Sequence, residues 1–364
     1  MTRFRRFRQL LAVASAVACS VVQAACATEA TNAPLTPATG EKPVLSILAN
    51  PRPIPTPVAA DYAAAVDSIV AVGARGTVLT YSWRDLEPDS ARLNVQQLIS
   101  DVRYARGRGL QVFVGLQPIN TVKREMPPDI AALPWTDARL QRRFERLLDA
   151  IAPVVNDITY LSIGNEVGDY LGAAGEWASY TSFVAREVTS LHRRSTAIKV
   201  GATIEFDAAK AQSAQATALF AVGDVAIYTH YPFASGYTVD VPTSTRTTFD
   251  RMITIAGGKP VVLQELGYPA SPLNGSSDSM QAAFYTDAIA QWKLRGSVRM
   301  PFVNLFLLHD FTPQQCADFV TYYNQPNQPA FVGFLCTLGL RKADGTARPA
   351  WEAVRTAAAW LRAP

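Results

Sequence analysis

The chain has 364 residues, of which 49% are hydrophobic and 18% are charged. This composition excludes a disordered protein and provides enough apolar material for one large core. Residues 1–27 contain four arginines and no acidic residue, so 30 of the 34 basic residues remain to balance 30 acidic ones. The formal charge of +4 therefore belongs to the N-terminal segment. The rest of the chain has no excess of positive charge, so we expect no nucleic-acid partner.

The N-terminal segment predicts export. The arginine-rich stretch MTRFRRFRQ, the apolar run LLAVASAVACSVV and the small residues QAACA occur in the order of a secretory signal peptide over residues 1–27. The apolar run is too short to cross a bilayer. We therefore expect a secreted or periplasmic protein with no membrane span. Cys26 is a candidate for lipid attachment, although Gln23 differs from the leucine usually found three residues before such a cysteine.

Residues 28–42 are rich in Thr, Ala and Pro, which is typical of a flexible tether. Residues 43–364 contain no second segment of this kind, and the simplest interpretation is one domain. Cys316 and Cys336 lie twenty residues apart in it. In an exported protein this pair predicts a disulfide that staples a loop, and the alternative is two separate buried thiols.

Eight short apolar runs recur along this domain, and each is nearly continuous in hydrophobicity. Such runs are typical of strands that helices cover on both faces. Segments whose apolar residues have helical spacing lie between or after several of these runs. They cover residues 58–74, 93–109, 137–155, 279–296 and 347–363. The predicted strands cover residues 44–50, 76–83, 111–119, 158–166, 198–206, 225–233, 260–268 and 301–311.

A strand and a helix repeated eight times predict an α/β fold that is a single (β/α)₈ barrel. The competing architecture is an open doubly wound sheet with a dinucleotide site. No G-x-G-x-x-G follows the first run, and no phosphate-binding loop sequence is present, which counts against that architecture. Active sites of barrels lie at the carboxyl ends of the strands. The residues that end the predicted strands are therefore the candidates for function.

Two carboxylates end their apolar runs most sharply, Glu166 in YLSIGNEV and Glu265 in LQELGY. Cleavage of a glycosidic bond requires a proton on the leaving oxygen and electron density at the anomeric carbon. Two facing carboxyl groups supply both when one is protonated and the other is ionised. The alternative for each glutamate is a structural ion pair with an arginine.

The motifs IGNEV and LQELGY resemble the clan A glycoside hydrolases, which are (β/α)₈ enzymes. YTHYPF on the sixth strand and the ending GLRKADGTARPAWEAV add to the resemblance, which covers residues 43–364. It implies that Glu166 is the acid/base and Glu265 the nucleophile. It also implies that Asn165 holds the 2-hydroxyl of the sugar and that Tyr231 lies close to Glu265. The motifs are also similar to those of β-1,3-glucanases and endo-β-1,4-galactanases.

The chain differs from this family at the eighth strand. Many members carry a tryptophan there as a platform for the sugar, whereas this chain has FLLHDF with His309. Further candidates for substrate binding lie at or near other strand ends. They are Trp83, Trp177, His230, His309 and Tyr268, with Trp135 and Glu205 as further candidates. The alternative for Trp83 is packing, and the alternative for His230 is a hydrogen-bonded core position.

Adjacent strand residues point to opposite faces. Asn165 and Glu166 can both reach the pocket only if the strand bends or bulges at its end, which is a structural prediction.

The sequence thus favours an exported retaining glycoside hydrolase that acts on a β-linked poly- or oligosaccharide by double displacement. Two alternatives are a barrel that binds glycan or scaffolds an envelope complex without cleavage, and a transglycosylase that uses the same residues. No serine-hydrolase or zinc-protease motif is present, so no cofactor or metal is implied. A monomer is the expected oligomeric state.

Overall fold

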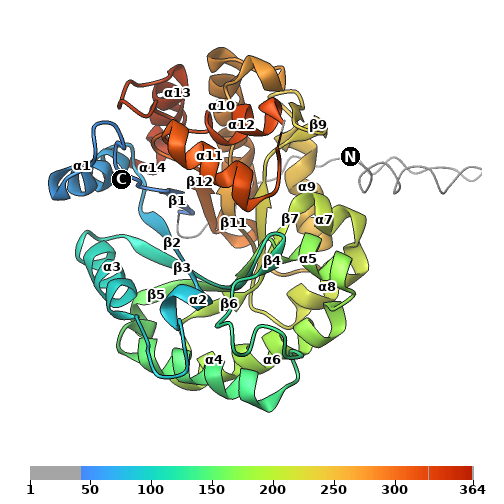
Figure 1. Ribbon diagram of the computed structural model, residues 1–364. Helices are drawn as coiled ribbons and strands as arrows, with labels where there is room; N and C mark the ends of the chain where they lie inside the picture. Colours follow the sequence, from blue (N-terminus) through green and yellow to red (C-terminus); the bar gives the residue numbers. More distant parts are fainter. Residues whose placement is uncertain (1–41, 327, 363–364) are drawn as a thin grey trace, which may run out of the picture. The chain divides into compact units, whose positions relative to one another are not determined.

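The computed structural model describes residues 42–326 and 328–362. Eight strand positions follow one another along the chain, and each pairs with its sequence neighbour in parallel (Figure 1). The predicted signal peptide, Cys26 and the tether before Lys42 lie outside the described residues. The barrel strands are β1 Val44–Ile47, β2 Gly76–Ser82, β3 Gln111–Asn120, β5 Ile158–Asn165, β6 Lys199–Gly201, β7 Thr203–Glu205, β8 Ala226–His230, β11 Val261–Leu266 and β12 Phe302–Leu305.

The fifth strand position is divided at Ala202. Its first part, β6, pairs with β5, and its second part, β7, pairs with β8. The pairing of β1 with β12 joins the first strand to the last. The sheet therefore closes on itself, and the predicted (β/α)₈ barrel is confirmed with all eight strands.

One long helix packs outside the barrel after each strand position (Figure 1). In the described residues these helices are α1 Ala59–Ala71, α3 Gln96–Gly107, α4 Ala138–Ile151, α6 Trp177–Arg194, α8 Ser213–Ala221, α9 Thr245–Ile255, α10 Asp278–Arg299 and α13 Pro349–Ala357. Helix α4 illustrates why they form. Asp137 caps it by accepting the backbone N–H of Arg139 at 2.7 Å, and Leu140, Phe144 and Leu147 form its buried stripe.

Shorter elements lie in the loops. The helices are α2 Trp83–Leu86, α5 Val167–Ala174, α7 Phe206–Ala211, α11 Pro313–Tyr322, α12 Pro329–Leu335 and α14 Ala359–Arg362, with 3₁₀ turns Ala152–Asp157 and Pro272–Asn274. Strand β4 Lys123–Arg124 pairs back on β3, and β9 Phe233–Ser235 pairs with β10 Thr238–Val239. Within the described part of the chain, no helix has the length and apolar character needed to span a bilayer.

The inside of the barrel is layered along its axis. The lower layer is apolar and includes Phe113, Tyr160, Ile227 and Phe302, all of which are buried. Such filling makes the barrel a packed core and not a pore.

A buried polar layer lies above the apolar one. Ser46 donates to Oδ1 of Asn304 at 2.7 Å, and Asn304 donates to the backbone carbonyl of Gln264 at 2.8 Å. Thr203 donates to Oε1 of Gln264 at 2.6 Å and lies 2.6 Å from the hydroxyl of Ser162. These bonds link five strand positions just below the mouth, which makes the floor of the mouth rigid.

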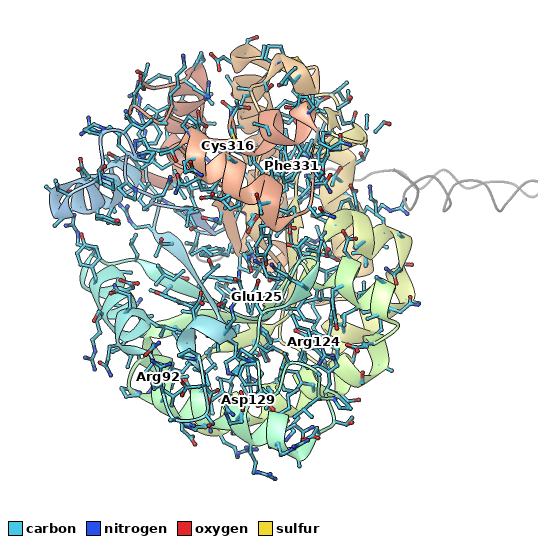
Figure 2. All side chains as sticks on the ribbon, viewed as in Figure 1. Arg92, Arg124, Glu125, Asp129, Cys316 and Phe331 are labelled. Carbon is cyan, nitrogen blue, oxygen red and sulfur yellow. A yellow bond between two sulfur atoms is a disulfide. The ribbon has the colours of Figure 1, made fainter. Side chains whose placement is uncertain are left out.

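The last predicted strand is too long. β12 ends at Leu305, and the described residues 306–326 and 328–348, here called the eighth loop, leave the barrel before α13 begins. The eighth loop carries α11 and α12, which the disulfide between Cys316 and Cys336 joins. The predicted staple is thus confirmed. Figure 2 shows Cys316 on α11 and Phe331 on α12 close to each other.

Candidate active site

The fourth strand position bends sharply at its end. Gly164 has φ +92° and Glu166 has φ +48°, both in the left-handed region. A Cβ at residue 164 would lie 2.4 Å from the hydroxyl oxygen of Tyr180, so only glycine fits there. The register between β3 and β5 shifts in this region. The predicted bend is confirmed, and it allows Asn165 and Glu166 to face the same side.

Two hydroxyl groups hold the half-buried carboxylate of Glu166. Thr121, in the turn after β3, donates to Oε2 at 2.7 Å. Thr229 on β8 donates to Oε1 at 2.7 Å. Each carboxylate oxygen thus has one donor, which fixes the plane of the group at the barrel mouth.

The seventh strand position bulges at Gln264. Leu263 pairs with Tyr228 and Glu265 pairs with Thr229, so Gln264 is the extra residue. The bulge brings the side chain of Glu265 to the inner side, where the hydroxyl of Tyr231 donates to its Oε2 at 2.5 Å.

Gly267 makes room for the ring of Tyr231. A Cβ at residue 267 would lie 2.5 Å from Cε1 of Tyr231. The glycine in the LQELGY motif therefore has a packing reason.

Asn165 links the two motifs. Its Nδ2 donates to Oδ1 of Asn120 at 2.9 Å, and its Oδ1 accepts Nε2 of Gln264. The same amide nitrogen of Gln264 lies 3.4 Å from Oε1 of Glu265. The side chains of the fourth and seventh strand positions therefore form one connected network.

Burial raises the pKa of both glutamates. It raises the pKa of Glu265 to about 8, and the negative charge of Glu166 adds to the increase, while the Tyr231 hydroxyl opposes it. Burial also raises the pKa of Glu166, and the hydroxyls of Thr229 and Thr121 act in the opposite direction. The two carboxylates are thus close enough for each charge state to influence the other, and the pair retains a proton at neutral pH.

A third carboxylate, that of Glu205, helps to position Glu166. Glu205, at the end of β7, accepts the backbone N–H groups of Gly168 and Asp169, each at 2.9 Å. These groups belong to the first turn of α5, which starts immediately after Glu166. Glu205 therefore caps α5 from a neighbouring strand and holds the turn that presents Glu166. Burial and the charge of Glu166 raise the pKa of Glu205 well above its ordinary value.

Five of the predicted substrate-binding residues do not belong to this site. Trp83 is fully buried, and its indole N–H donates to Glu87 at 2.8 Å. Trp177 is buried in α6 and donates to Gln212 at 2.8 Å. A buried ring offers no face to a sugar, so both predictions are corrected to core positions. The further candidate Trp135 is likewise buried.

His230 lies on the wrong face of its strand. Ile227 of the same strand belongs to the inner core and Thr229 reaches Glu166, whereas Tyr228 bonds to the backbone carbonyl of Met252 on α9. Alternation along the strand therefore turns His230 outward, where its ring packs against Phe206 at 5.3 Å. Burial lowers its pKa to about 4, so this histidine is neutral at pH 7.

His309 and Tyr268 stabilise loops. The ring of His309 lies 2.8 Å from the backbone oxygen of Asn50, and Asn50 also bonds both backbone groups of His309. Tyr268 is buried, donates to the carbonyl of Asp240 at 2.6 Å and stacks on Phe284. Both residues are held by the loops around them and do not bond either glutamate.

The sequence analysis missed Thr229, Gln264 and Thr121. Thr229 could have been predicted, because it precedes Tyr231 by two residues and so shares its strand face. Gln264 required knowledge of the bulge, and Thr121 required knowledge of the turn after β3. Tyr323, from the eighth loop, lies beside Thr121, and the charges of Glu166 and Glu265 help burial to raise its pKa.

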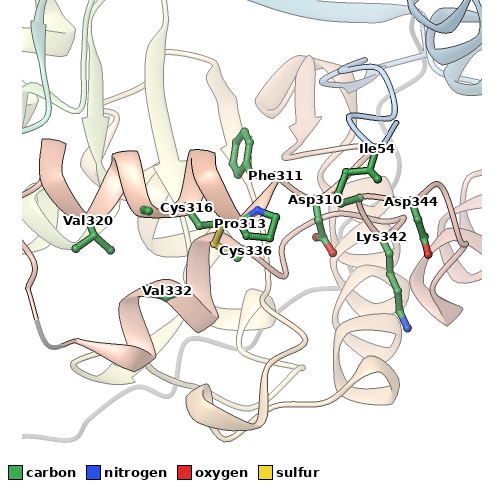
Figure 3. Close-up of a pocket in the computed structure, with 12 residues that line it drawn as sticks. Ile54, Asp310, Phe311, Pro313, Cys316, Val320, Val332, Cys336, Lys342 and Asp344 are labelled. Atoms are coloured by element: carbon green, nitrogen blue, oxygen red, sulfur yellow. A yellow bond between two sulfur atoms is a disulfide. The ribbon is translucent and has the colours of Figure 1, made fainter. Parts of the chain in front are cut away.

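A separate pocket of about 700 Å³ lies beside the disulfide (Figure 3). Its lining includes Val320 of α11, Val332 of α12 and Phe311, which precedes α11. It shares no residue with the two glutamates or with the groups that bond them. The pocket is therefore separate from the candidate catalytic residues.

Comparisons with known proteins identify the fold. No family model and no curated protein matches the sequence. Among solved structures, GH5_18 from Streptomyces cattleya, a glutamate-to-alanine variant in complex with Manβ1-4GlcNAc, has a TM-score of 0.68 at 18% identity, over 88% of this chain and 82% of its own. An exo-β-1,4-mannosidase from an Opitutaceae bacterium has a TM-score of 0.65 at 14% identity, over 87% of this chain and 59% of its own.

A family 39 glycoside hydrolase from Bacteroides cellulosilyticus gives a TM-score of 0.62 at 14% identity, over 88% of this chain and 64% of its own. At these identities the likeness shows the fold. The chain has the (β/α)₈ fold found in these glycoside hydrolases, as the two strand-end motifs predicted.

Proposed function

We propose that this chain is a retaining glycoside hydrolase that cleaves β-linked glycans. The observation that carries the proposal is the meeting of Glu166 and Glu265 at the carboxyl ends of the fourth and seventh strand positions. Each carboxylate accepts short hydrogen bonds from hydroxyl groups, and their charges interact. Acid-assisted displacement at an anomeric carbon requires a pair of carboxyls of which one is protonated and the other is ionised.

In the proposed mechanism, Glu166 protonates the glycosidic oxygen while the carboxylate of Glu265 attacks the anomeric carbon. The bond to the leaving sugar breaks, and a glycosyl ester forms on Glu265. Glu166, now ionised, then takes a proton from water, and the resulting hydroxide oxygen displaces Glu265. Both steps invert the carbon, so the product retains its configuration.

The roles proposed for the two glutamates are those that the resemblance of IGNEV and LQELGY to clan A motifs implies. Hydrogen bonds stabilise the ionised form of both, with Thr121 and Thr229 at Glu166 and Tyr231 at Glu265. For the proposed roles, the proton that the pair retains resides on Glu166 in the substrate complex. The assignment of Glu166 as acid/base and Glu265 as nucleophile is therefore a proposal that kinetics must test.

The dependence of the rate on the leaving group distinguishes the acid/base from the nucleophile. A 2,4-dinitrophenyl glycoside leaves without protonation, whereas a disaccharide needs the acid. We expect Glu166→Gln to lose most activity on a disaccharide but to retain formation of the glycosyl-enzyme from the dinitrophenyl substrate. Glu265→Gln should lose about a thousandfold or more on both substrates, since no nucleophile remains. Exposed Glu352→Gln on α13 is the matched control and should behave like the wild type.

The first substrates to test are β-mannosides. One structural neighbour is named as an exo-β-1,4-mannosidase, and another was solved with Manβ1-4GlcNAc. β-Glucosides, β-galactosides and β-xylosides complete the panel, and proton NMR of the first product reports its anomeric configuration. Inversion would overturn the retaining mechanism, and binding without cleavage by the wild type would favour a glycan-binding protein.

Export is also part of the proposal. The order of residues in 1–27 supports a cleaved signal peptide, and the disulfide is compatible with an extracellular location. Mass spectrometry of the protein from a secreting host would give the mature N-terminus. Retention of residues 1–27 on the exported protein would contradict this part of the proposal.

A further inference from the structure

The eighth loop is fixed at its base. Its helices α11 and α12 run out from the barrel and back, and the disulfide joins the first turn of α11 to the end of α12. Aromatic contacts fill the space beneath it. Phe334 of α12 packs on Tyr231 with ring centroids 4.9 Å apart, and Phe331 packs on Tyr237 at 5.5 Å. The loop therefore rests directly on the tyrosine that bonds Glu265.

The eighth loop is also fixed at its tip, Tyr322 and Tyr323, on the residues of the β3–β4 hairpin. The hydroxyl of Tyr322 donates to Oε1 of Glu125 at 2.9 Å, and Nζ of Lys123 lies 3.6 Å from the centre of the Tyr322 ring. Glu125 is buried and paired with Arg84 at 2.8 Å. Figure 2 shows Glu125 near the middle of the strand ring, on the side of the eighth loop away from α10 and α13.

The tip contacts the turn that holds the site. Asn120 and Thr121, which bond Asn165 and Glu166 respectively, lie next to Tyr322 and Tyr323. Tyr323 packs on Phe331 of α12 at 5.6 Å, so it is part of the same aromatic layer. The loop thus reaches from the end of β12 to the hairpin of β3 and β4 and passes beside both glutamates.

We propose that the eighth loop closes one side of the mouth and restricts the site to the ends of β-linked chains and to short oligosaccharides. An internal stretch of polysaccharide needs a groove that is open at both ends. A loop fastened at its base by a disulfide and at its tip by Tyr322 and Glu125 removes one of those openings. This inference rests on the proposed function, because it describes which part of a glycan reaches the same two glutamates.

The experiment compares a short and a long substrate of the same linkage. Wild-type protein is incubated with β-1,4-mannotriose to β-1,4-mannohexaose and with β-1,4-mannan, and the corresponding β-glucan and β-galactan sets are run in parallel. Products are sized by chromatography from the earliest times, and polymer length is followed by viscosity. We expect release of one or two sugar residues with no early fall in viscosity.

Internal fragments at early times would overturn the closed mouth while leaving glycoside hydrolysis intact. No cleavage of any set would overturn the proposed function, and this inference with it. The two failures are therefore distinguishable.

Substitution of Tyr322 tests whether the fastened eighth loop is the cause of the preference for short substrates. Tyr322→Ala should release the tip and raise the ratio of polymer to trisaccharide activity by about tenfold or more. Tyr322→Phe retains the ring over Lys123 and removes the hydroxyl that bonds Glu125 and Asn120, so it should shift the ratio less in the same direction. Tyr104→Phe, on the exposed face of α3, is the control and should leave the ratio unchanged. An unchanged ratio in both Tyr322 variants, with normal melting temperatures, would contradict the proposal.

Discussion

The hydroxyl of Tyr231 donates a 2.5 Å hydrogen bond to Oε2 of Glu265 and so joins the ends of β8 and β11 at the barrel mouth. The bond stabilises the ionised carboxylate and orients it. Its geometry depends on the bulge at Gln264 and on the space that Gly267 leaves for the tyrosine ring.

Removal of that donor should move the pH profile. In Tyr231→Phe the ionised form of Glu265 loses a hydrogen bond, so the pKa of Glu265 should increase beyond its already raised value. The acidic limb of kcat/KM should shift to higher pH, and kcat should fall by about 10- to 100-fold. The measurement is the pH dependence of both constants on an aryl β-glycoside. A profile identical to that of the wild type would show that the hydroxyl has no role in the ionisation of Glu265.

The stability of the protein should decrease as the pH rises toward 8. Burial raises the pKa of Glu265 from an ordinary 4.5 to about 8, so between these values the folded state binds a proton that the unfolded state releases. That contribution is fully present below about pH 4.5 and is lost through about pH 8. Glutamine cannot ionise, so Glu265→Gln avoids this loss, and the variant should melt higher than the wild type at pH 8 by roughly 2–10 °C.

The difference between the two proteins should shrink toward pH 5, because most of the stability that the wild type loses between about pH 4.5 and pH 8 is then restored. Thermal denaturation from pH 5 to pH 8.5 checks this. Parallel curves for the two proteins would contradict the raised pKa.

Gly267, two residues after the seventh-strand glutamate, should be required for full activity. Gly267→Ala would place a Cβ 2.5 Å from Cε1 of Tyr231 and displace the ring. We expect a loss of activity similar to that of Tyr231→Phe. The double variant should lose no more than either single variant, because both act on one bond. Gly107→Ala, where a Cβ would meet no atom within 4 Å, is the matched control.

The disulfide should stabilise the eighth loop. Cys316 and Cys336 are separated by 20 positions, and closing a loop of about this length contributes about 3 kcal/mol in the chain-entropy model. The Cys316→Ser/Cys336→Ser double variant should unfold at lower urea concentration than the wild type. Its ratio of polymer to trisaccharide activity should be higher. A lower urea midpoint with an unchanged ratio would assign the disulfide to stability alone.

The sequence by itself was sufficient for the fold, because the evidence for each strand is local. A buried parallel strand is a short run of apolar residues, and eight such runs separated by helical segments leave few topologies. The bend after the fourth strand could also be predicted, since Asn165 and Glu166 are adjacent and the pleat alternates. The last strand was extended too far, because the apolar residues of FLLHDF pack in the eighth loop.

Only the tertiary structure decided which residues belong to the candidate active site. His230 and Tyr231 are neighbours in the sequence, yet the pleat turns one toward the helices and the other toward Glu265. Trp83 and Trp177 are aromatic residues at the expected end of the barrel, but their rings fill the core. Thr121 and Tyr323 reach the glutamates from a turn and from a distant loop. Hydrophobic periodicity specifies which residues are buried together along one element, whereas contacts across a barrel mouth depend on register, bulges and loop paths that only the folded chain defines.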